Sequence, residues 1–227
     1  MEVPSDLIDL GGKRCVVAVF EGTDGSGKTS LLRLTARVLR SRRKKVVTYK
    51  TPSRTETGTF AISYGNRRTV SPLTRMLLFL ANTVEDSRVM MRAVGRARAD
   101  YLLIDRYYLC SVVFGLAYLR YSGVIVETKA SDLMRLVEEL GKGVLVTPDV
   151  YVIVDVEERE RLRRLARGTK GFLEEVTEFQ ELVREGYREF AANSRAEVIW
   201  VDNAPNSLTS NVERVAELLL QLPPSSG

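Results

Sequence analysis

A glycine-rich segment near the N-terminus carries the residue types best suited to chemistry. Residues 22–29 read Gly-Thr-Asp-Gly-Ser-Gly-Lys-Thr, with the spacing of a phosphate-binding loop. In such a loop the glycines let backbone N–H groups turn inward around a phosphate, and the following helix adds positive potential. Lys28 can then reach the β- and γ-phosphates of a nucleoside triphosphate, and the Thr29 hydroxyl can bind Mg²⁺. The residues expected at the phosphates are Gly22, Thr23, Asp24, Gly25, Ser26, Gly27, Lys28, Thr29 and Ser30.

A second group suited to Mg²⁺ stands at the end of an apolar run. Asp105 follows the run Tyr-Leu-Leu-Ile at residues 101–104. A carboxylate at the end of a neighbouring strand is the usual second partner of the metal ion. The next residue is Arg106, where motor-type ATPases place a water-activating Glu, and an arginine there can contact two phosphate groups. The pair of residues therefore favours a kinase. The alternative is that Asp105 and Arg106 only form a salt bridge at the surface. No guanine-reading Asn-Lys-x-Asp sequence is present, which argues against a GTPase.

These residues need a frame of strands and helices to bring them together. Runs rich in β-branched residues are typical of buried parallel strands, at residues 15–20, 45–49, 101–104, 150–156 and 198–201. Helical patterns occupy residues 28–40, 72–81, 84–99, 108–121, 131–140, 157–167, 174–192 and 208–220. The alternation predicts an α/β fold, a doubly wound three-layer α/β/α domain with a five-stranded parallel sheet. We expect this single domain to span residues 1–222, followed by a disordered tail at 223–227.

The composition excludes several classes of protein. The chain has 227 residues, 44% of them hydrophobic, which is enough for one domain with a sizeable core. The longest apolar runs are too short to span a bilayer, and the first ten residues carry three acids instead of a signal pattern. We therefore expect a cytoplasmic protein with no membrane partner. Cys15 and Cys110 lie in apolar contexts and are expected to be free thiols, with a disulfide as the alternative.

The net charge of +5 raises the question of a nucleic-acid partner. The basic residues gather at 40–45 and 159–170 without interleaved aromatic residues, so we expect no binding to nucleic acid. The first cluster suits a helix end, where cations complement the helix dipole. The chain has no histidine, which excludes a histidine base or metal ligand. The scarcity of glutamine and the predominance of arginine favour a thermophilic source.

Several motifs follow one another along the chain with regular spacing. They are Phe20-Glu21 leading into the phosphate loop, Pro52-Ser53-Arg54, Asp105-Arg106-Tyr107, Thr147-Pro148-Asp149, and Val-Arg-Glu-Gly-Tyr at 183–187. Together they resemble the thymidylate kinase family of P-loop nucleoside monophosphate kinases, in a divergent, archaeal-like form. The resemblance implies transfer of the γ-phosphoryl group of ATP to dTMP, giving dTDP and ADP, with Mg²⁺ held by Thr29 and Asp105. It also implies a homodimer.

The resemblance also assigns residues to the acceptor nucleotide. Asp24 would hold the 3′-hydroxyl of the sugar, and Arg54 and Arg106 would grip the acceptor phosphate. Phe79 would stack on the base, and Phe114 would lie under the deoxyribose and crowd out a 2′-hydroxyl. Without the family pattern the two phenylalanines would be core residues at helical spacing, and Arg54 a surface residue.

A basic segment at 159–173 is interpreted as a lid that closes over the nucleotides. Phosphoryl transfer spreads negative charge over the transferring oxygens, so a mobile arginine can stabilise it when both substrates are bound. Members of the family carry this arginine in the phosphate loop or in the lid, and position 25 is Gly. Arg164 and Arg167, three residues apart, are the expected catalytic residues beside Lys28 and Arg106. A solvated basic helix is the alternative.

The departures from the family pattern gather around the base. Thr83 occupies the position of an arginine that reads thymine O4, while Cys110, Gly115 and Gly171 replace other usual residues. Kinase chemistry is unaffected, but selectivity for thymine is left open. A broad-specificity (deoxy)nucleoside monophosphate kinase is therefore the close alternative, and a nucleotide-sensing or ATPase module the remote one.

Overall fold

A five-stranded sheet forms the centre of the protein. The computed structural model describes residues 15–166 and 173–222. All strand pairs are parallel, and the spatial order is β2-β3-β1-β4-β5. The strands are β1 (Val16–Glu21), β2 (Val46–Lys50), β3 (Tyr101–Asp105), β4 (Val150–Asp155) and β5 (Glu197–Asp202). The α/β fold, the five strands and their parallel pairing confirm the prediction from the sequence, with boundaries that differ by one or two residues.

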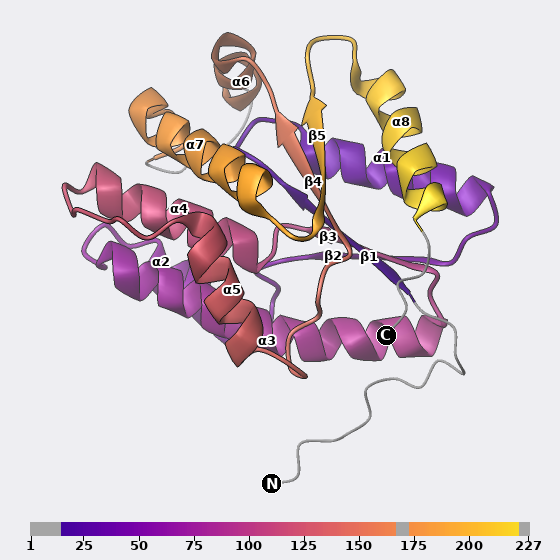
Figure 1. The fold of residues 1–227 in the computed structure, drawn as a ribbon, viewed down its shortest axis with the longest axis horizontal. Helices are drawn as coiled ribbons and strands as arrows, with labels where there is room; N and C mark the ends of the chain where they lie inside the picture. The colour runs from indigo at the N-terminus through magenta and orange to yellow at the C-terminus, as the bar shows by residue number, and fades with distance from the viewer. Residues whose placement is uncertain (1–14, 167–172, 223–227) are drawn as a thin grey trace, which may run out of the picture.

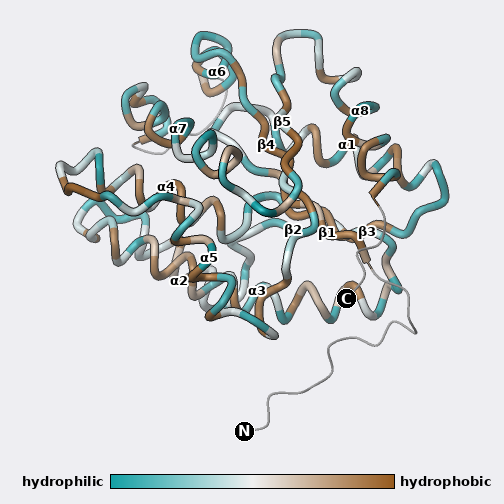
Figure 2. Tube along the Cα trace, in the orientation of Figure 1, coloured by the Kyte–Doolittle hydropathy of each residue, from teal (hydrophilic) through white to brown (hydrophobic). Residues whose placement is uncertain are grey.

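The three inner strands consist of apolar runs because helices cover the sheet on both faces. Every residue of β1 and β3 is buried, and the two strands are largely brown in Figure 2. Phe20 pairs with Asp105 in the parallel register, so the carboxyl ends of β1 and β3 meet at one edge of the sheet. In open α/β sheets ligands bind at this edge, beyond the carboxyl ends of the strands.

Two helical layers enclose the sheet (Figure 1). The helices α1 (Lys28–Ser41) and α8 (Leu208–Gln221) pack side by side on one face over a core that includes Leu31, Leu39 and Val215. On the other face lie α3 (Pro72–Ala97), α4 (Tyr108–Tyr121), α5 (Ala130–Leu140) and α7 (Thr177–Asn193). Within the described residues, no helix is both long and apolar enough to cross a membrane. Cys15 and Cys110 are free thiols, as predicted.

The structure corrects the sequence prediction at two helices. The predicted helices 72–81 and 84–99 form the single helix α3, because Asn82 is buried and donates to Asp86 at 2.7 Å, one turn further on. These side-chain contacts offset the low helix propensity of Asn82 and Thr83. A helix absent from the prediction, α2 (Glu56–Gly65), packs against α3. Two glycines and several β-branched residues weaken its helical signal, and its clearest sequence sign is the cap formed by Thr55.

The segment predicted to be a lid begins with the short helix α6 (Glu158–Leu165). The helical prediction for residues 157–167 therefore extends a little too far at both ends. Arg167 and the glycines at 168 and 171 lie outside the described residues, as does the predicted tail at 223–227.

Candidate active site

The phosphate loop connects β1 to the N-terminus of α1 and needs its glycines. Gly22, Gly25 and Gly27 have positive φ angles of 139°, 85° and 91°, which favour glycine. A Cβ at Gly27 would lie 2.4 Å from Nδ2 of Asn203. A steric clash therefore disfavours any side chain at this position, in addition to the positive φ angle. Gly27 is the N-cap of α1, and the first residues of the helix therefore direct their N–H groups toward the loop.

Several polar groups of the loop are buried without a protein partner. The hydroxyls of Thr23 and Ser26 lack hydrogen bonds within the described residues. Lys28 is 6% exposed, and its Nζ donates to the carbonyl of Thr23 at 3.2 Å and lies 3.8 Å from Asp24. Burial, reinforced by Arg106, lowers the pKa of Lys28. A bound phosphate would satisfy these donors and favour the charged amine. Ser30, at the third position of α1, is exposed.

The two predicted metal ligands lie together although 76 residues separate them. Oγ1 of Thr29 donates to Oδ2 of Asp105 at 2.6 Å, because α1 begins beside the end of β3. The other carboxylate oxygen, Oδ1, is buried and has no hydrogen bond within the described residues. Nζ of Lys50 is 3.9 Å from Oδ2. A hydroxyl and a carboxylate are the hard oxygen ligands that Mg²⁺ prefers, so the residues fit this ion.

Arg106 lies at the floor of the adjoining cavity in a left-handed backbone conformation, with φ of 68°. Its guanidinium forms an ion pair with Asp24, donates to Sγ of Cys110 at 2.8 Å, and lies 5.1 Å from the ring centre of Phe114. Burial opposes the charge of Asp24, but Arg106, Lys28 and Arg161 together outweigh burial and hold the pKa of this carboxyl below its usual value. Burial raises the pKa of the Cys110 thiol to about 11, so the sulfur accepts this bond as a neutral thiol.

Glu21 fixes the turn that carries Arg106. Its side chain is fully buried and accepts hydrogen bonds from the backbone N–H groups of Tyr107, at 2.9 Å, and Cys110, at 3.2 Å. The hydroxyl of Tyr187 donates to the other carboxylate oxygen at 3.1 Å. Burial raises the pKa of Glu21 to about 7. From the sequence, Glu21 was noted only as part of the Phe20-Glu21 motif that leads into the phosphate loop.

A cavity of about 460 Å³ opens between Arg106 and the helices α2, α3 and α4. Four predicted acceptor residues line it, namely Asp24, Phe79, Arg106 and Phe114. Arg54 and Thr83 are not among the residues that line it. Arg54 is exposed on the loop before α2, and Thr83 is 2% exposed with its hydroxyl donated to the carbonyl of Leu80 at 2.6 Å. Thr83 therefore faces the protein interior, with its hydroxyl satisfied by its own helix.

The lining also includes polar residues that sequence reasoning missed, among them Lys50, Arg75 and Asn82. Arg75 is four residues before Phe79, which is the helical spacing that could have indicated it. Asn82 was noted only within the motif around Phe79. Lys50 is the last residue of β2, and its proximity to Asp105 arises from the parallel register between β2 and β3.

Two arginines of α6 bind the phosphate loop. Arg164 donates to the carbonyls of Ser26, at 3.1 Å, and Asn203, at 2.8 Å, and pairs with Glu160. Arg161 is fully buried and donates to the carbonyls of Asp24, at 3.3 Å, and Glu174, at 2.6 Å. A Cβ at Gly25 would lie only 3.0 Å from the carbonyl oxygen of Arg161. The loop therefore has no room for an arginine of its own at position 25.

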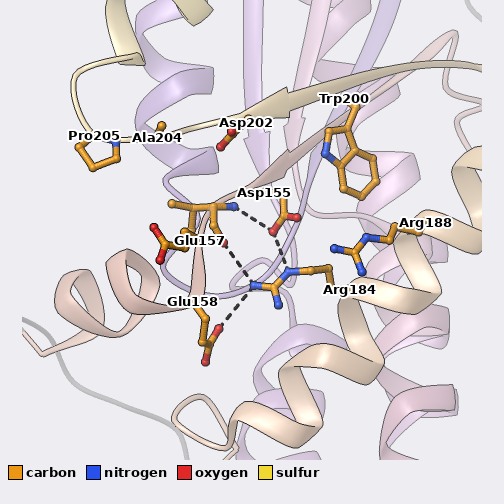
Figure 3. A pocket seen from close by; sticks show the side chains of 10 residues that line it. Asp155, Glu157, Glu158, Arg184, Arg188, Trp200, Asp202, Ala204 and Pro205 are labelled. Carbon is orange, nitrogen blue, oxygen red and sulfur yellow. Dashed lines mark hydrogen bonds and ion pairs between the residues drawn. The ribbon is translucent and has the colours of Figure 1, made fainter.

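A second hollow lies beyond the ends of β4 and β5, and an ion-pair network forms its wall (Figure 3). Arg184 donates to Oδ1 of Asp155 at 2.9 Å and to the carbonyl of Val156 at 3.2 Å, and it also pairs with Glu158 at the start of α6. Asp155 accepts a further bond from the N–H of Val156 at 2.9 Å. The network joins α7 to the turn between β4 and α6, so it fixes the base of the predicted lid.

The strand order, the phosphate loop and the adjoining acceptor cavity define a P-loop nucleoside monophosphate kinase. The family model "Thymidylate kinase" matches residues 20–215, and the chain belongs to this family.

Curated relatives agree with this assignment, and a solved structure shares the fold. A thymidylate kinase of Nostoc sp. is 29% identical over 201 residues, which cover 85% of this chain and 89% of that protein. A "Probable thymidylate kinase" of Archaeoglobus fulgidus is 27% identical over 212 residues, covering 93% of this chain and all of the relative. The structure of Candida albicans thymidylate kinase has the same fold, with a TM-score of 0.70, 20% identity and coverage of 91% and 92% of the two chains.

Proposed function

We propose that this kinase transfers the γ-phosphoryl group of ATP to dTMP and releases dTDP and ADP. The observation that carries the proposal is the cavity beside the phosphate loop, with Arg106 and Asp24 at its floor and Phe79 and Phe114 on its walls. A cation at the floor suits a phosphate, and the aromatic walls suit a sugar and a base. A protein that only senses or hydrolyses a triphosphate has no need for such a second site.

The proposed chemistry relies on position and charge. The loop amides and Lys28 hold the donor phosphates, while Arg106 orients the acceptor phosphate, whose oxygen is already ionised and needs no base. Mg²⁺, bound by Thr29 and Asp105, would neutralise charge on the donor phosphates. Asp24 holds the sugar hydroxyl. Arg54 belongs to the proposal as a second phosphate ligand, and this requires its exposed side chain to turn toward the cavity.

Release of ADP in the presence of Mg²⁺ tests this function directly. We expect ATP with dTMP to give turnover far above the rate with ATP alone. The same assay is repeated with dUMP, dCMP, dGMP or dAMP in place of dTMP. Chromatography then identifies the nucleotide products. If none of the five monophosphates stimulates ADP release, the kinase proposal is wrong.

A broad-specificity deoxynucleoside monophosphate kinase is the second candidate. It is favoured by Thr83, which lies outside the cavity lining and so offers no group to the base. The Candida albicans relative is described as having broad substrate specificity. Equal kcat/KM values for dCMP and dTMP would decide in favour of this candidate.

The proposal includes a homodimer and a cytoplasmic location. On α2 and α3, Phe60 is 54% exposed, Leu73 48% and Leu77 54%, which gives these helices apolar positions that a second copy could cover. Light scattering after size-exclusion chromatography should give about twice the chain mass of 25.5 kDa. Free thiols at Cys15 and Cys110 suit a reducing compartment.

A further inference from the structure

We infer that Arg75 reads the base of the acceptor nucleotide and selects pyrimidines that present a carbonyl oxygen at position 4. The inference rests on the proposed function, because it concerns the base in the same cavity. Three residues of α3 follow one another at intervals of four: Arg75, Phe79 and Thr83. Arg75 and Phe79 line the cavity, whereas Thr83 is buried and bonds to its own helix.

Arg75 lies beside the ring on which the base is proposed to stack. Its guanidinium carbon is 5.5 Å from the ring centre of Phe79, and both side chains border the same cavity. The guanidinium lies over the ring of Phe79, so a base that enters the cavity against Phe79 would come within reach of the guanidinium as well. Gly65 of α2 makes this close packing possible, since a Cβ there would lie 3.3 Å from the Phe79 ring.

The donors of Arg75 are nearly free. Its one hydrogen bond among the described residues is a long contact of 3.4 Å from Nη1 to the carbonyl of Gly65. No carboxylate in the described part of the chain lies within ion-pair distance of it. Burial lowers the pKa of Arg75, which means that the charged group lacks full compensation. A guanidinium has five N–H donors and no acceptor, so several donors remain available to a ligand.

Two other polar side chains of the cavity, Asn82 and Arg106, are already engaged. Asn82 donates to Asp86 at 2.7 Å, and its oxygen accepts from the hydroxyls of Thr55, at 3.2 Å, and Thr57, at 3.3 Å. Arg106 is occupied by Asp24 and Cys110 at the phosphate end. Lys50, the other cation of the lining, lies 3.9 Å from Asp105 at the proposed metal site. Arg75 is therefore the cavity cation that lies beside the aromatic wall.

The chemistry of the guanidinium sets the choice of base. A group that only donates hydrogen bonds favours the 4-oxo group of thymine or uracil over the 4-amino group of cytosine, which would face it with another donor. A hydrogen bond to a charged group is worth about 1.5–3 kcal/mol, or roughly a 10- to 150-fold difference in affinity. In the family pattern the arginine that reads the base comes one helical turn after the stacking Phe, at the position of Thr83. In this chain Arg75 would do so from one turn before Phe79.

The test compares Arg75→Met with a matched control, Arg67→Met. The guanidinium carbon of Arg67 lies 5.2 Å from the ring centre of Tyr64, a similar cation–π contact, but Arg67 does not line the cavity. The dissociation constants for dTMP and dCMP are measured by calorimetry, and kcat/KM by ADP release. In Arg75→Met we expect dTMP binding to weaken about 10- to 100-fold, with dCMP changed less than about 3-fold. Arg67→Met should behave as the wild type, and Arg75→Lys should recover part of the dTMP preference.

Two outcomes would overturn the inference. One is an unchanged dTMP-to-dCMP ratio in Arg75→Met, and the other is an equal loss for both nucleotides, which would indicate a structural or phosphate-binding role. The binding ratio does not depend on turnover, so the two proposals can fail separately. A wild-type protein that binds dTMP selectively through Arg75 without releasing ADP would refute the proposed function and support the inference.

Discussion

The hydroxyl of Thr29 donates a 2.6 Å hydrogen bond to Oδ2 of Asp105 and leaves Oδ1 of that buried carboxylate without a partner among the described residues. The pair joins the first turn of α1 to the end of β3. It combines a neutral oxygen and a charged oxygen at the place where the loop would present the donor phosphates.

We predict that Asp105→Asn weakens the binding of Mg²⁺ to the kinase. Asparagine can still accept the bond from Thr29 but lacks the charge, so the Mg²⁺ concentration for half-maximal activity should rise about 10- to 100-fold. The control is Asp132→Asn, which removes an exposed ion pair with Arg135 on α5. Titration of activity with Mg²⁺ measures the effect. Equal Mg²⁺ curves for wild type and Asp105→Asn would show that Asp105 has no part in metal binding.

Glu21→Gln should flatten the pH dependence of stability. Burial raises the pKa of Glu21 from 4.5 to about 7, so between these values the folded protein holds a proton that the unfolded chain has lost. The free energy of unfolding contributed by this group therefore falls as pH rises, by up to about 1.4 kcal/mol per pH unit. Glutamine is neutral and of similar shape, so its contribution does not change with pH.

Urea unfolding at pH 5, 6 and 7 measures this difference, with Glu127→Gln at an exposed position as the control. Parallel curves for wild type and Glu21→Gln would mean that Glu21 does not titrate in this range.

Arg164→Met should act mainly on ATP. Arg164 donates to the carbonyls of Ser26 and Asn203, so its loss loosens the donor side of the site. We expect the KM for ATP to rise about 10-fold, with little change in the KM for dTMP. Arg163→Met is the matched control, since Arg163 pairs with the same Glu160 but is exposed. A fall in kcat of about 1,000-fold at unchanged KM would instead assign Arg164 to transition-state charge, as the sequence analysis expected.

Arg184→Met should destabilise the protein. Arg184 joins Asp155, Val156 and Glu158, and its removal leaves the carboxylate of Asp155 without its cation. The free energy of unfolding should fall by about 2–3 kcal/mol. This is no more than the smallest loss usual for breaking a fully buried ion pair, because Asp155 keeps some contact with solvent. Arg188→Met, which breaks an exposed pair with Glu181, should cost about 0.5 kcal/mol or less. Thermal unfolding compares the two variants, and equal losses would contradict a structural role for the network.

Local patterns in the sequence predicted much of the frame. Apolar runs marked the five strands because buried parallel strands need apolar residues on both faces. The prediction failed for α2 and for the continuity of α3. The bond from Thr55 to Asn82 joins the start of α2 to α3, and the bond from Asn82 to Asp86 supports α3 where local propensity is low. Because such contacts depend partly on how the helices pack, they produce no periodic pattern in the sequence.

The sequence by itself determined the phosphate loop, since its glycines, Lys28 and Thr29 act through backbone geometry that is encoded within one short segment. It also marked Asp105 and Arg106 at the end of a strand. Only the tertiary structure decided which residues meet the acceptor. Helix spacing puts Arg75 beside Phe79, but the packing of α2 against α3 places both at the cavity wall. In the same fold Thr83 faces the interior and Arg54 is exposed. A pocket formed between helices depends on how they pack, and that packing is set by contacts between residues distant in the chain.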